Sequence, residues 1–170
     1  MAMLPFEPTP FFKDKNRAFW RLQAIGWGGT MILRAATAIA NDLPPDFLVV
    51  VVIAAITGLS ISLILSVIYG QLINRKPYIT WSATAVALAA AVGISAFVNA
   101  WTLSVYQGGS AETGFANLML GVFYLDMTLL GAWSALYYAI NFFLQVEEQN
   151  DQLLRLENQA TSAQLAMLRY

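Results

Sequence analysis

Cysteine and histidine are both absent from this chain, and charged residues are scarce. Without cysteine and histidine there is no disulfide, no thiol redox chemistry and no nucleophile or general base of either type. An ordinary zinc site and a histidine-ligated haem or copper site are excluded as well. The six methionines are scattered along the chain and are best explained by packing. The sequence therefore predicts a chain without a cofactor, a metal site or a catalytic residue.

The low charge content places the chain in a broad class. Only 11% of its 170 residues are charged and 58% are hydrophobic, whereas soluble domains usually contain about 25% charged residues. The formal net charge is -1, which provides neither a basic surface for nucleic acid nor a strongly acidic surface for cationic partners. This composition predicts an integral membrane protein that contacts lipid and does not bind nucleic acid.

Four apolar runs are each long enough to cross a bilayer, whose core of about 30 Å requires about 20 helical residues. They cover residues 19–40, 47–70, 79–106 and 117–146. Turn-forming sequences separate them, namely NDLPPD, NRKP and QGGSAETG. No proline lies inside a run, which argues against the broken helices of many transporters. The sequence predicts an all-α fold, a four-helix transmembrane bundle.

The basic residues predict how this bundle is oriented. Lys and Arg are concentrated before the first run and between the second and third runs, and are absent from the other two loops. These residues are Lys13, Lys15, Arg17, Arg21, Arg75 and Lys76. Because cytoplasmic loops are enriched in Lys and Arg, both termini are expected in the cytoplasm. Residues 1–18 are then a cytoplasmic N-terminal segment and residues 19–146 the membrane domain.

Several polar and aromatic residues within the runs are candidates for ligand binding. Arg34 and Asp126 are expected at similar depth, where each charge costs at least about 2.5 kcal/mol unless it is paired or hydrated. They form either an ion pair that fixes helix register or a switch opened by a ligand or by protonation. Asn99 either holds helices together or contacts a ligand, and the aromatic residues form either a pocket or interfacial belts. The candidate ligand-binding residues are Arg34, Asn99, Trp101, Tyr124 and Asp126.

The last run continues into a helix that carries the 3-4 spacing of a two-stranded coiled coil. No proline or glycine follows Gly131, so a helix from Asn117 to the last residue would be about 80 Å long. Residues 147–170 are expected to form a cytoplasmic coiled-coil signalling helix that pairs two copies of the chain. The predicted dimer seam comprises Ala132, Ala135, Ala139, Val146, Leu153, Leu156, Ala160, Ala163, Met167 and Tyr170, and Phe142 and the polar Gln149 keep the same register.

The final residues also resemble a known family. The run AQLAMLRY, residues 163–170, is similar to the segment that immediately precedes the phosphoacceptor motif N-P-H-F-L-F-N in sensor histidine kinases of the LytS and AlgZ type. The resemblance implies a membrane sensor region of a longer two-component kinase, whose full-length form would use ATP and a response regulator. Because the phosphorylated histidine and the ATP-binding domain are both missing here, this chain alone cannot phosphorylate anything.

The sequence thus favours a sensor and dimerisation module that transmits a stimulus sensed in or near the bilayer along its fourth helix. Lipid, quinone, peptide, membrane tension and a small apolar molecule all remain open as the stimulus. A four-span scaffold or assembly subunit whose cytoplasmic helix docks a partner is the alternative. A small transporter is disfavoured, because the runs are unbroken and contain few charges.

Overall fold

The computed structural model describes residues 15–73, 75–108 and 114–168. The described residues form α-helices and no strands, which confirms the all-α prediction. The four helices are α1 (Lys15–Ala40), α2 (Phe47–Leu72), α3 (Pro77–Tyr106) and α4 (Phe115–Leu168). The predicted roles of residues 1–14 and of Tyr170 lie outside the described residues.

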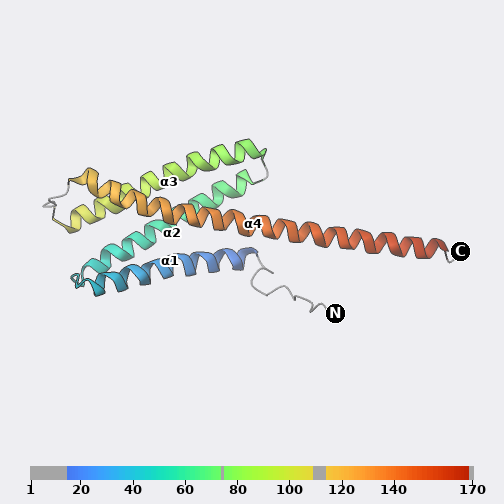
Figure 1. Cartoon of the computed structure of the whole chain (residues 1–170), viewed down its shortest axis with the longest axis horizontal. Helices are drawn as coiled ribbons and strands as arrows, with labels where there is room; N and C mark the ends of the chain where they lie inside the picture. The colour runs from blue at the N-terminus through green and yellow to red at the C-terminus, as the bar shows by residue number, and fades with distance from the viewer. Residues whose placement is uncertain (1–14, 74, 109–113, 169–170) are drawn as a thin grey trace.

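The helices form an antiparallel bundle in which each helix packs against the next one in sequence (Figure 1). Helix α4 also contacts α1 and α2, so the four helices close around a common interior. The α1–α2 connection lies at the same end of the bundle as the end of α3 and the start of α4 (Figure 1). The start of α1 and the long continuation of α4 lie at the other end (Figure 1). We call these the loop end and the tail end of the bundle.

Three helices of the described residues are long and apolar enough to cross a membrane. Their most apolar windows have a mean hydropathy of 2.8 in α2, 1.8 in α3 and 1.5 in α4. Helix α1 has 26 residues but does not reach this apolarity, because it contains Arg17, Arg21, Gln23 and Arg34. The prediction of a membrane protein is supported by three helices, whereas the predicted span at residues 19–40 is not among them.

A contact between an aromatic ring and a glycine joins α1 to α2. The Trp27 ring packs directly on Gly58, and a Cβ atom at that glycine would overlap the ring. The Trp27 Nε1 atom donates a hydrogen bond of 3.0 Å to Ser62 Oγ. The Ser62 hydroxyl lies 2.9 Å from Gln23 Oε1 and 2.8 Å from the Leu59 carbonyl oxygen, both of which are acceptors. Gln23 and Trp27 of α1 are therefore buried against α2, with their Oε1 and Nε1 atoms hydrogen-bonded to Ser62.

The core of the bundle is aromatic toward the tail end. Tyr69 is fully buried and stacks on Trp133, with ring centroids 6.4 Å apart. The Tyr69 and Ser134 hydroxyls share a hydrogen bond of 3.0 Å, and Thr84 and Tyr138 share one of 2.6 Å. These hydrogen bonds connect α2 and α3 to α4. Several aromatic residues of α4 therefore serve as core packing rather than as a membrane-surface belt.

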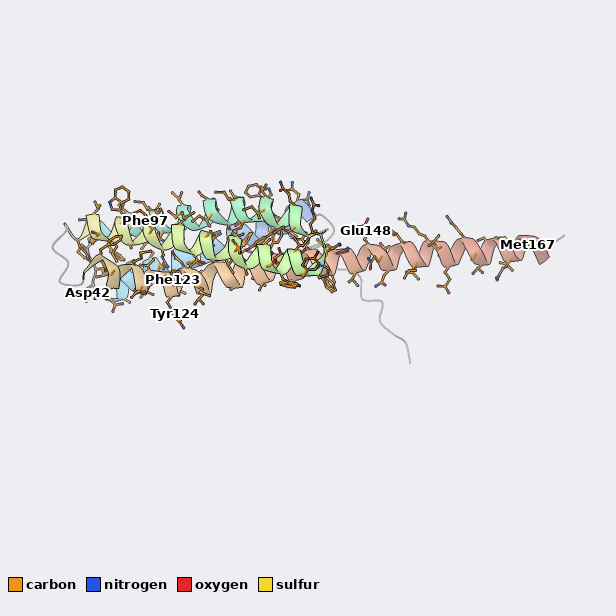
Figure 2. The ribbon with its side chains drawn as sticks, turned by 90° about the horizontal axis from the view of Figure 1, so that it is seen from above. Asp42, Phe97, Phe123, Tyr124, Glu148 and Met167 are labelled. Carbon is orange, nitrogen blue, oxygen red and sulfur yellow. The ribbon has the colours of Figure 1, made fainter. Side chains whose placement is uncertain are left out.

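Helix α4 has 54 residues and runs unbroken out of the bundle at the tail end (Figure 2). At 1.5 Å per residue it is about 80 Å long, and the prediction of one continuous helix is confirmed. Glu148 lies where α4 leaves the bundle, and Met167 lies near the far end (Figure 2). From Glu148 onward every described side chain of α4 is exposed. We call residues 147–168 the α4 extension.

Candidate ligand-binding site

A buried polar cluster joins α3 to α4. The Ser95 hydroxyl donates a hydrogen bond of 2.7 Å to Asp126 Oδ2, and Asn99 Nδ2 donates one of 2.9 Å to the same oxygen. All three residues are at least nine-tenths buried. This arrangement fixes the orientation of the Asn99 amide, because the flipped form would place two oxygen acceptors together. The Asn99 Oδ1 atom is buried and accepts no hydrogen bond from the described residues.

Arg34 lies near this cluster on α1. Arg34, Ser95 and Asp126 all border a small cavity of about 10 Å³. A cavity of this size holds about one water molecule. Within the part of the chain that the structure describes, the Arg34 side chain makes no ion pair or hydrogen bond. Arg34 and Asp126 are thus neighbours across a cavity, while the carboxylate is held by Ser95 and Asn99.

A larger pocket adjoins Arg34 and extends toward the loop end of the bundle. Its volume is about 700 Å³, within the range of roughly 300–1,000 Å³ that is typical of small-molecule sites. All four helices contribute to it, and its walls are mostly aliphatic. It is lined by Thr30, Leu33, Arg34, Thr37, Ala38, Asn41, Leu43, Phe47, Val50, Val51, Ala54, Asn99, Leu103, Val122, Leu125 and Leu129. We call this space the four-helix pocket.

The structure brings together three of the five candidate residues proposed from the sequence. Arg34 and Asn99 line the four-helix pocket, and Asp126 is hydrogen-bonded to Asn99. Trp101 and Tyr124 are 59% and 77% exposed and do not line it. Tyr124 projects away from the helices in Figure 2.

The sequence reasoning missed the polar residues around Arg34. Thr30 and Thr37 line the four-helix pocket, and they lie four and three residues from Arg34 on the same face of α1. Each threonine hydroxyl donates to a backbone carbonyl oxygen of α1, that of Gly26 or Leu33, so the hydroxyl oxygen can still accept. This spacing was the signal that could have identified the pocket face of α1.

A second pocket of about 350 Å³ lies between α1, α2 and α4 at the tail end. Its lining is Asn16, Phe19, Leu22, Ser66, Tyr137, Ile140 and Asn141. The Tyr137 hydroxyl already donates to the Ser66 carbonyl oxygen at 3.2 Å, and Asn141 Nδ2 donates to the Tyr137 carbonyl oxygen at 2.8 Å. Because these donors are engaged, this pocket offers a ligand fewer specific contacts than the four-helix pocket does.

The predicted dimer seam forms an exposed stripe on α4. Every described member is classed as exposed, including Leu153 at 64% and Leu156 at 61%. The stripe starts with small residues beside the bundle, at Ala132, Ala135 and Ala139. Leucines 154 and 165 are 57% and 63% exposed and lie outside this seam. The α4 extension thus presents apolar side chains on more than one face.

No known protein family, curated protein or solved structure matches this chain. The geometry of the bundle and the resemblance of residues 163–170 are the features of the chain that bear on function.

Proposed function

We propose that this chain is the membrane sensor and dimerisation module of a two-component sensor histidine kinase. In this proposal all four helices cross the cytoplasmic membrane of a bacterium, and both termini are cytoplasmic. The α4 extension would lead into a kinase domain that uses ATP and a response regulator. Support for the kinase part comes from the resemblance of residues 163–170 to the segment before the phosphoacceptor motif.

The sensor part of the proposal depends on one observation: α4 both lines the pocket and forms the extension. This helix lines the four-helix pocket with Val122, Leu125 and Leu129, and it continues without a break through the α4 extension. A ligand that fits between α4 and the other helices would favour one position of α4 over another. Helix shifts of about 1–2 Å are a common form of signal transmission.

The antiparallel packing supports the assignment of α1 as a fourth span. Helix α1 lies alongside α2. At the interface between the two helices, Trp27 of α1 contacts Gly58 and Ser62 of α2. Its start lies at the tail end of the bundle, next to the point where α4 leaves it (Figure 1). With four spans the N-terminus and the α4 extension are on one side of the membrane, and the basic residues make this side cytoplasmic.

Dimerisation through the exposed stripe would complete the module. Small residues at Ala135 and Ala139 allow two α4 helices to approach closely in the membrane, and Leu153 and Leu156 provide apolar contacts in water. Ala160 makes the coil weaker than an all-leucine seam would be. Such weakness suits a joint that changes register in response to the membrane domain.

Cysteine cross-linking in membranes tests this proposal, and the chain offers a cysteine-free background. We expect Leu153→Cys, Leu156→Cys and Ala160→Cys to cross-link between protomers far more efficiently than the matched controls Arg155→Cys and Asn158→Cys. All five positions are exposed in the single chain, so accessibility alone does not separate them. Cross-linking at equal rates around the α4 extension would refute the seam.

The membrane half of the seam needs its own cross-linking experiment. Ala135→Cys and Ala139→Cys should follow the phase of the cytoplasmic positions, with Leu136→Cys as the off-seam control, since it too is exposed. Periodic cross-linking that stops at Val146 would confine the interface to the cytoplasm. The kinase part is tested by the reading frame after Tyr170, which is expected to continue into N-P-H-F-L-F-N and an ATP-binding domain.

A scaffold that docks a partner protein is the second candidate function. The observation that favours it is the exposure of Leu154 and Leu165 outside the seam, because these side chains would remain uncovered in a simple two-stranded coil. A partner helix bound there would leave the α4 extension monomeric. The same cross-linking series distinguishes the two functions, since a scaffold of this type gives no periodic cross-links between copies of the chain.

A further inference from the structure

The positive charge of Arg34 has no partner within the part of the chain that the structure describes. Arg34 lies six residues before the end of α1 at Ala40, which is about 9 Å along the helix. A cationic side chain at this depth in a membrane is costly unless an anion or water compensates it. The surroundings of Arg34 therefore indicate what kind of group is missing.

Asp126 makes no direct ion pair with Arg34 among the described residues. Its Oδ2 atom already accepts hydrogen bonds from Ser95 and Asn99, and a cavity of only about 10 Å³ borders both charged residues. That space is too small for any ligand larger than water. The four-helix pocket is the other space that Arg34 borders, and it is large enough for a ligand.

The walls of the four-helix pocket favour a hydrocarbon chain. Aliphatic side chains from every helix line it, among them Leu33 on α1, Val50 on α2, Leu103 on α3 and Leu125 on α4. Arg34 supplies its one charged group, and Asn99, which also lines it, has a buried Oδ1 atom without a hydrogen-bond donor among the described residues. A long apolar wall with one cation matches an amphiphile with an acidic head group, and the unused acceptor matches a hydroxyl donor next to that head group.

We propose that the four-helix pocket binds an anionic amphiphile with a single hydrocarbon chain. The carboxylate or phosphate head group pairs with the Arg34 guanidinium, whose planar donors suit such oxygens, and the chain lies among the aliphatic side chains. A free long-chain carboxylate and an anionic lysophospholipid share this chemistry. The glycerol hydroxyl of the lysophospholipid could also donate to Asn99 Oδ1. The inference rests on the proposed function only in treating this pocket as the stimulus site.

Binding to the full chain in a neutral detergent tests the proposal. Dibromostearate is the probe, because its bromine atoms quench tryptophan fluorescence and Trp27 borders the small cavity next to the pocket. Saturable quenching should be reversed by oleate and by oleoyl-lysophosphatidylglycerol. Oleyl alcohol and oleoyl-lysophosphatidylcholine, which lack net negative charge, should compete about tenfold less well or worse, as expected for loss of one charge-assisted hydrogen bond.

Two variants relate binding to the pocket itself. Arg34→Gln should remove the preference for anionic competitors, whereas Arg155→Gln, a matched change on the exposed α4 extension, should preserve it. Val122→Phe keeps the charge and adds no tryptophan to the fluorescence readout, but it fills space beside the chain and should weaken the binding of all competitors about tenfold or more. Val122 is partly exposed and lines the pocket, so this variant keeps the test informative if Arg34→Gln does not fold.

The outcomes distinguish a free carboxylate from a lipid head group. They also distinguish failure of the pocket proposal from failure of the proposed function. Tighter competition by oleate supports a free carboxylate, and tighter competition by the lysophospholipid supports a lipid head group. Equal competition by charged and uncharged amphiphiles, unchanged binding in Val122→Phe, or absence of saturable quenching would each overturn the inference. The cross-linking pattern of α4 is measured without any probe, so failure of binding leaves the dimer test intact.

Discussion

The contact between Trp27 and Gly58 allows a sharp test of how α1 is held in the bundle. We expect Gly58→Ala to destabilise the protein, because the new methyl group would occupy the position of the Trp27 ring. Trp27 is 9% exposed, so its ring has little free space into which it can move. Moving the ring also breaks the hydrogen bond from Trp27 Nε1 to Ser62 Oγ, which is 3.0 Å long.

The magnitude follows from three contributions. Overpacking a well-packed interior costs about 1–3 kcal/mol, and loss of the buried hydrogen bond costs about 0.5–1.5 kcal/mol. Replacing glycine by alanine within a helix stabilises it by up to about 1 kcal/mol. The net loss in the free energy of unfolding is therefore about 1–3 kcal/mol. The matched control Gly93→Ala has open space for its methyl group, and should differ from Gly58→Ala by about 2–4 kcal/mol.

The measurement is a denaturant titration of the detergent-solubilised chain, with helix content and tryptophan fluorescence as separate readouts. A partial rescue is expected in the double variant Trp27→Phe with Gly58→Ala, since the smaller ring reduces the overlap, and the two losses should fall short of additivity by at least about 1 kcal/mol. If Gly58→Ala is no less stable than Gly93→Ala, the packing argument for α1 is wrong.

Three further predictions concern topology, the buried cluster and the core. A reporter fused after the α4 extension should be cytoplasmic and one inserted after Gly108 external, and the reverse pattern would overturn the four-span topology. Asp126→Ala and Asn99→Ala should each lower the free energy of unfolding by about 1–3 kcal/mol, because each leaves a buried polar group unpaired. The loss in the double variant should be less than the sum of the two single losses. Strict additivity would show that the hydrogen bond between Asn99 and Asp126 contributes nothing to stability. Tyr138→Phe should lower stability by about 0.5–1.5 kcal/mol in the same titration by removing the hydrogen bond to Thr84, and unchanged stability would contradict its role in joining α3 to α4.

Hydrophobic run length predicted the helices well and their membrane role less well. The expected runs at residues 47–70 and 79–106 end within two residues of α2 and α3, because turn sequences rich in proline and glycine bound them. Helix α1 also forms where expected, yet its apolarity falls short of the other three helices. The arginines and Gln23 of α1 explain the difference, and Gln23 Oε1 and Trp27 Nε1 are hydrogen-bonded to Ser62 of α2.

The candidate site was predicted only in part. Arg34, Asn99 and Asp126 stood out because a polar residue in an apolar run is conspicuous in any sequence. The hydrogen bond from Asn99 to Asp126 depends on the rotation of α3 against α4, which spacing within one helix does not determine. The apolar walls of the pocket have no distinctive pattern, since pocket-lining leucines and lipid-facing leucines look alike in a sequence.

The unbroken course of α4 has a mechanical consequence. The α4 extension of residues 147–168 is about 33 Å long at 1.5 Å per residue, and no glycine or proline follows Gly131 to act as a soft joint. A tilt of about 5° where α4 leaves the bundle would therefore displace the far end by roughly 3 Å, more than half the 5.4 Å pitch of a helical turn. A stiff helix of this length is a lever arm, which turns a small tilt where α4 leaves the bundle into a larger displacement at its far end.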